Sequence, residues 1–87
     1  MKIKSGFIIR EVAGKNVAVA TGELSRSFNG MITLNDTAKF IFESFQQETT
    51  VEEVVQAVLA KFDIDEVTAK KDVQTLVDQL KGANLFS

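Results

Sequence analysis

The chain has 87 residues, a net charge of −2 and a pI of about 5.0, and it contains no His, Cys, Tyr or Trp. This composition excludes disulfides and thiolate or imidazole metal sites and lacks the usual general base, so we expect no catalytic residue, metal or cofactor. The acidic balance does not favour nucleic acid, and no apolar run is long enough to span a membrane. We therefore expect a single domain over residues 1–87 that works in the reducing cytoplasm, with neither nucleic acid nor membrane as a partner.

The first part of the chain predicts three short strands. Residues 7–21 are expected to form a β-hairpin, because β-branched and aromatic runs flank the turn residues Ala13–Asn16. Residues 22–29 are polar and mixed and are assigned no element, although Phe28 is expected to turn inward. Residues 31–34 form the third strand, which has no evident partner next to it in the sequence. Such a free edge is able to accept another chain.

The rest of the chain predicts three helices, each opened by a residue whose side chain accepts a hydrogen bond from the first turn. The caps are Asn35 for a helix over 36–46, Thr50 for a helix that starts at 51 and stays apolar as far as Phe62, and Asp65 for a helix over 66–81. Thr50 and Glu53 form a capping box, and the valine-rich residues that follow lie on one face that packs on a core. Gly82 is expected to end the last helix, and residues 84–86 to fold back.

These elements predict an α+β fold, in which a three-stranded antiparallel sheet is followed by three helices in a winged-helix-like arrangement. Three strands cannot bury a face alone, and one-sided helices need a surface to pack on, so sheet and helices should lie side by side. Strand alternation places Met31 and Thr33 on the face opposite Ile32 and Leu34. An alternative is that all four residues simply build the core side of a small sheet.

Six short segments follow one another in a specific order and spacing. The most informative one, Gly30–Ala38, reads Gly-Met-Ile-Thr-Leu-Asn-Asp-Thr-Ala, and the others are Ile9–Gly14, Thr21–Gly22, Thr50–Val55, Asp72–Val73 and Gly82–Leu85. With these segments the chain resembles the PqqD-like family, named for protein D of pyrroloquinoline quinone biosynthesis, and the resemblance extends over nearly all of the chain. Phe42 departs from the family pattern, since many relatives carry Trp at this position.

The resemblance implies a peptide-binding module that recognises the leader of a ribosomally made precursor. Such modules present the precursor to a modifying enzyme, often a radical S-adenosylmethionine enzyme. The leader is expected to pair with the third strand, along Gly30, Met31, Ile32, Thr33 and Leu34, and to lie against a wall formed by Lys70, Gln74 and Val77 of the last helix. The product of the pathway, pyrroloquinoline quinone or another modified peptide, stays open.

Other interpretations compete with this one. Lys70 and Gln74 also fit an ordinary solvated helix face, and the acidic residues near Asp65 fit helix capping better than a metal cluster. A winged-helix DNA-binding or protein-interaction regulator without catalysis is the alternative function, but the charges of the last helix cancel, which disfavours DNA. The free third strand is also able to pair with a second copy and give a homodimer.

Overall fold

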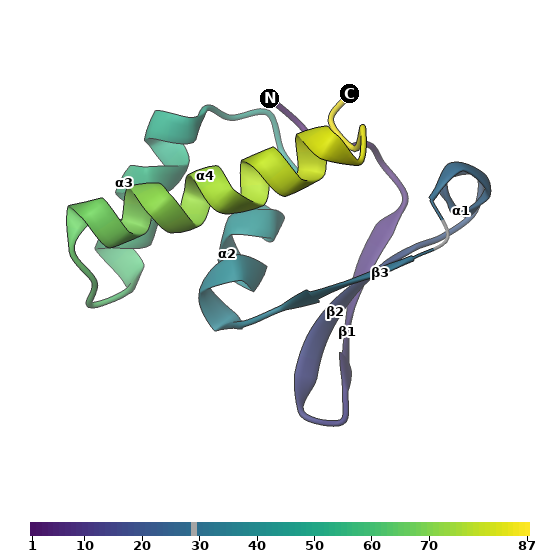
Figure 1. The fold of residues 1–87 in the computed structure, drawn as a ribbon, viewed down its shortest axis with the longest axis horizontal. Coiled ribbons are helices and arrows are strands. Elements are labelled where there is room, and N and C mark those ends of the chain that lie inside the picture. The colour runs from purple at the N-terminus through teal and green to yellow at the C-terminus, as the bar shows by residue number, and fades with distance from the viewer. Residues whose placement is uncertain (29) are drawn as a thin grey trace.

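The computed structural model describes residues 1–28 and 30–87, and it shows a three-stranded antiparallel sheet beside a group of helices (Figure 1). Within the sheet the strand order is β1-β2-β3, which follows the order of the chain. The elements are β1 (Phe7–Val12), β2 (Lys15–Ala20), α1 (Leu24–Ser27), β3 (Met31–Leu34), α2 (Asp36–Ser44), α3 (Val51–Lys61) and α4 (Glu66–Gly82). The predicted α+β fold is confirmed.

The β1–β2 hairpin projects away from the helices (Figure 1). Its turn consists of two residues, Ala13 (φ 52°) and Gly14 (φ 78°), and Val12 pairs with Lys15 across it. The turn is therefore shorter than the predicted Ala13–Asn16, because left-handed backbone at both central residues matches the twist of the two strands.

The three predicted caps are confirmed. Asn35 Oδ1 accepts a hydrogen bond from the backbone N–H of Ala38 at 2.8 Å, and Thr50 Oγ1 accepts one from the N–H of Glu53 at 3.2 Å. Asp65 Oδ1 accepts one from the N–H of Thr68 at 2.7 Å. Each cap thus satisfies a backbone donor that has no partner inside its helix. The structure ends α2 at Ser44, two residues before the predicted boundary.

The end of α4 corrects one expectation. Gly82 is the last residue of the helix, and Asn84 (φ 58°) takes the left-handed position two residues later. The N–H of Asn84 bonds to the carbonyl of Lys81 at 3.0 Å, and the N–H of Leu85 bonds to that of Leu80 at 2.9 Å, which is a Schellman motif. This stop turns Leu85 into the core.

A short helix, α1, lies in the segment to which the sequence assigned no element. Its four residues include one buried side chain, Leu24, which anchors the helix to the core. Phe28 follows it and turns inward as predicted, and its ring lies edge-on to that of Phe7, with 5.7 Å between the two ring centroids. Residue 29, also in that segment, lies outside the described residues.

The core lies between the inner face of the sheet and the helices, and α4 packs against both α2 and α3 (Figure 1). No polar side chain is buried among the described residues. Both chain ends take part, since Ile3 is buried and forms an isolated bridge with Phe86. The largest fully buried side chains are Phe42, Phe45, Ile3, Ile41, Leu80, Val54, Val58, Val73 and Val77.

The Asp65 cap makes part of the stability sensitive to acid. Hydrogen bonds from the backbone N–H and then the hydroxyl of Thr68 hold the pKa of Asp65 below its ordinary value of 3.8. A depressed pKa in the folded state stabilises the fold above the unfolded pKa, and this contribution is lost as the pH falls through the folded value.

Asp65→Asn keeps a cap acceptor but cannot titrate. Its free energy of unfolding, measured by denaturant titration below about pH 5, should fall less steeply than that of the wild type. If the free energy of unfolding fell equally steeply with pH in the two proteins, the ionised Asp65 cap would not stabilise the fold.

Candidate functional site

The free edge of β3 is the first element of the site. On one side β3 pairs with β2, with Thr33 opposite Val17 and Met31 opposite Val19, and no described strand pairs with its other side. Ile32 and Leu34 are buried, whereas Met31 (69% exposed) and Thr33 face away from the core. The predicted alternation is therefore confirmed, and the edge offers backbone donors and acceptors to another chain.

A groove runs beside this edge, between the end of β3 and α4, and we call it the β3–α4 groove. Its volume is about 320 Å³. A second hollow of about 380 Å³ shares Thr33, Leu34 and Asn35 with it and extends it towards the β1–β2 turn. The β3–α4 groove is lined by Thr33, Leu34, Asn35, Thr37, Ala38 and Ile41 on one wall and by Lys71, Asp72, Thr75, Leu76 and Gln79 of α4 on the other.

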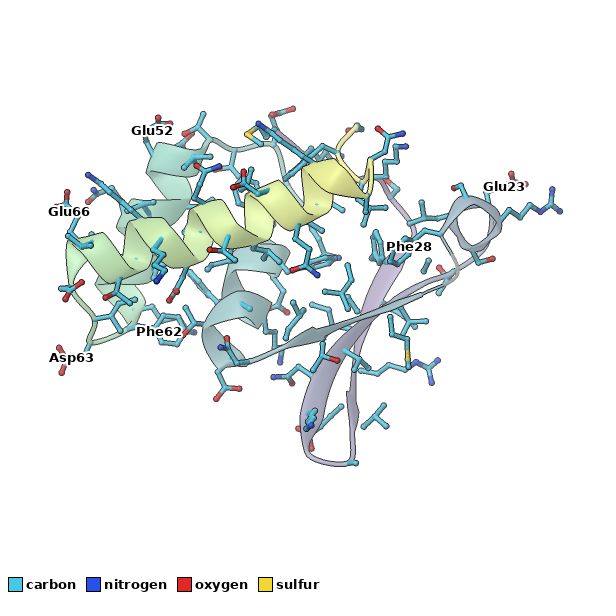
Figure 2. The ribbon with its side chains drawn as sticks, viewed as in Figure 1. Glu23, Phe28, Glu52, Phe62, Asp63 and Glu66 are labelled. Atoms are coloured by element: carbon cyan, nitrogen blue, oxygen red, sulfur yellow. The ribbon has the colours of Figure 1, made fainter. Side chains whose placement is uncertain are left out.

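The predicted wall residues lie elsewhere on α4. Lys70 and Gln74 line a separate cleft of about 660 Å³ between α3 and α4, and Val77 is fully buried in the core. Glu52 and Glu66, which line the same cleft, lie on the side of the helices away from the sheet (Figure 2). Residues of β3 and α4 thus line one groove, but these three residues are not among them.

The charges of α4 are balanced on both of its sides. Lys70 Nζ lies 2.9 Å from Glu66 Oε1, and this ion pair raises the pKa of Lys70 and lowers that of Glu66. On the groove side, Asp72 follows Lys71, a residue of opposite sign that also lines the α3–α4 cleft. The β3–α4 groove therefore carries balanced charge over a partly apolar floor, which suits a peptide held mainly through its backbone.

Among residues 1–28 and 30–87, the side chains contain no group of three His, Cys, Asp or Glu that is able to hold a metal ion. No helix of this described part is both long enough and apolar enough to cross a membrane. The site consists of a strand edge and a groove, which are features of peptide-binding surfaces.

Two solved structures share this fold. TbiB1 in complex with the TbiA(beta) leader peptide is similar over 98% of this chain and 93% of that chain, with a TM-score of 0.71 and 19% identity. Lasso peptide synthetase B1 complexed with the leader peptide is similar over 97% of this chain and 93% of that chain, with a TM-score of 0.68 and 19% identity.

At the level of sequence, no curated protein matches this chain. The family model described as coenzyme PQQ synthesis protein D (PqqD) matches residues 15–85, which include β2, β3 and all four helices. The matched part also contains both walls of the β3–α4 groove. The chain therefore belongs to the PqqD family.

Proposed function

We propose that this protein binds the leader segment of a precursor peptide and presents the precursor to a peptide-modifying enzyme. The observation that carries the proposal is the free edge of β3 beside a groove with α4. Support comes from the two similar structures, each of which is a complex with a leader peptide. The protein itself acts as a binding partner rather than as a catalyst.

In this proposal the leader adds a strand to β3. Four residues of β3 offer an edge about 13 Å long, since each residue of a strand advances about 3.3 Å. Main-chain hydrogen bonds provide much of the affinity, and alternate leader side chains enter the β3–α4 groove, where Ile41 and Leu76 offer apolar contacts. We therefore propose that the α4 wall is formed by Lys71, Thr75 and Gln79, in place of Lys70, Gln74 and Val77.

We propose from the family that the partner enzyme is a radical S-adenosylmethionine enzyme or another enzyme that modifies peptides. We also propose that the two proteins work in the cytoplasm.

The free edge of β3 also fits a second copy of this chain. A leader and a second copy would compete for the same backbone groups, so leader binding should dissociate a homodimer formed through β3.

Titration with the leader peptide encoded nearest to this gene tests the proposal. An added strand hydrogen-bonds the β3 amides that point to the free edge, so their protons should exchange more slowly with solvent. NMR shifts should follow residues 30–34 and the α4 wall of the β3–α4 groove. Shifts confined to the α3–α4 cleft, with residues 30–34 unchanged, would contradict the proposed site.

Duplex DNA should not bind measurably at physiological salt. A DNA-reading helix needs a basic surface, but α4 carries three Lys against three acidic residues, and Lys70 is paired with Glu66. Fluorescence anisotropy with a random labelled duplex is the measurement. Micromolar affinity that weakens steeply with salt would instead support the DNA-binding alternative.

A further inference from the structure

We infer that the outer face of the sheet is a second docking surface, and that its partner is a protein with an apolar and acidic surface. The partner that fits is the modifying enzyme, so this inference rests on the proposed function and deepens it. A leader bound to β3 would enlarge the same surface, which makes recruitment of the enzyme depend on the leader.

The outer sheet face is defined by five apolar side chains that point away from the helices. None of the five belongs to the core cluster or packs against it, whereas their neighbours Phe7, Ile9, Ala18 and Ile32 do. They are Ile8 and Val12 of β1, Val17 and Val19 of β2, and Met31 of β3. Ile8, Val12 and Met31 are exposed, so this face of the sheet is left uncovered.

These side chains line up across the strands. Ile8 pairs with Val19, and Val19 pairs with Met31, so an apolar row crosses the whole sheet and ends at the free edge of β3. Beside it, Val17 lies outside the core cluster but is only 6% exposed, and its cross-strand partners are Arg10 on β1 and Thr33 on β3. The accessible apolar surface of the outer face is therefore the row of Ile8, Val19 and Met31, and an exposed apolar row of this kind fits an interaction site.

The charges on this face have a single sign. Arg10 and Lys15 are the charged residues at outward-facing positions, in a chain that has 12 acidic and 10 basic residues. All the carboxylates of the described strands and helices lie elsewhere: Glu11 is on the opposite side of β1, and Asp36 starts α2. An apolar centre with two cations and no acid is complementary to an apolar surface that carries carboxylates.

The charges of the face argue against a second copy of this chain as the occupant, and its small size means that any partner must also contact neighbouring surface. Three strands of up to six residues cover an area about 14 Å wide and 20 Å long, or about 300 Å². A stable interface buries about 800 Å² per partner. Two copies packed face to face would also bring Arg10 and Lys15 of one copy against those of the other, which costs energy.

A leader strand would supply part of the missing area. Once paired with β3, it adds a fourth strand, and the leader residue opposite Met31 extends the row of Ile8, Val19 and Met31 by one side chain. The enzyme would then contact this chain and the leader together. By thermodynamic linkage, the leader raises the affinity for the enzyme by the same factor as the enzyme raises the affinity for the leader.

The test uses the full chain, the leader peptide and the peptide-modifying enzyme encoded nearest to this gene, with Arg10→Glu and Ile8→Ser as variants. Both positions are on β1, away from the leader edge, so the affinity for the leader should stay within about twofold. The affinity for the enzyme, measured by calorimetry with the leader bound, should fall roughly tenfold. It should also be higher with the leader than without it in the wild type.

The matched controls are a charge reversal and an apolar-to-Ser change away from the outer sheet face. Lys81→Glu and Val67→Ser, both at exposed positions of α4, should bind the enzyme like the wild type. The inference is overturned if the wild type does not bind the enzyme, or if Arg10→Glu and Ile8→Ser bind it unchanged. It is also overturned if Arg10→Glu abolishes self-association in sedimentation, or binding to vesicles of anionic phospholipid, because another occupant then covers the face. Failure of the wild type to bind the leader would instead contradict the proposed function.

Discussion

Val58→Asp is expected to leave the domain largely unfolded at 25 °C. Val58 lies in the middle of α3 and is 0% exposed, with the core around it. A buried carboxylate without a partner costs several kcal/mol. A domain of this length has a total stability of roughly 4–13 kcal/mol, so this one change removes a large part or all of it. Thermal melting followed by circular dichroism should show a lost or strongly lowered transition.

Val67→Asp is the matched control for this change. Val67 is 77% exposed near the start of α4, where an added carboxylate also faces the positive end of the helix dipole. Its melting temperature should stay close to that of the wild type. If Val58→Asp melted like Val67→Asp, α3 would not bury its valine stripe as the structure describes.

Thr75→Arg should abolish or strongly weaken leader binding without unfolding the protein. Thr75 is exposed on the α4 wall of the β3–α4 groove, whose volume is only about 320 Å³. A long cationic side chain at this position would occupy the space that leader side chains enter. We expect a loss of at least about tenfold in affinity, which is roughly 1.4 kcal/mol, measured by calorimetry with the leader peptide.

Gln74→Arg introduces the same side chain at the neighbouring position. Gln74 lines the α3–α4 cleft, where it donates a hydrogen bond to Asp78 at 2.8 Å, and this exposed contact contributes little. Its leader affinity should match that of the wild type. The reverse result, with Gln74→Arg impaired and Thr75→Arg intact, would support the wall first predicted from the sequence and reject the β3–α4 groove.

The features of the fold that depend on near neighbours could be predicted from the sequence. Asn35, Thr50 and Asp65 each cap a helix through a donor three residues away, so local rules were sufficient. The end of α4 depends on more than local preference. Glycine favours a left-handed backbone, which pointed to Gly82, but a stop at Asn84 is the one that buries Leu85.

The two sides of the candidate site also differ in whether the local sequence is enough to predict them. The edge of β3 follows from strand alternation, which is a local pattern, and the structure confirms which residues are buried. The wall on α4 depends on how the helix is rotated about its axis. Successive residues of a helix are about 100° apart, so choosing Lys70 and Gln74 instead of Lys71 and Thr75 selects another face. That rotation is set by packing on α2 and α3 together, which the sequence of α4 does not contain.

The pairing of the chain ends has a consequence for the lifetime of the folded state. Each strand pairs with its neighbour in the sequence, and such topologies fold fast. The bridge between Ile3 and Phe86, in contrast, closes a loop of almost the whole chain, and that entropy cost is recovered only when the core is complete. We expect this contact to form after the transition state for folding. Weakening it would then accelerate unfolding and leave the folding rate nearly unchanged. The contact between the two ends therefore lengthens the lifetime of the folded state by slowing unfolding.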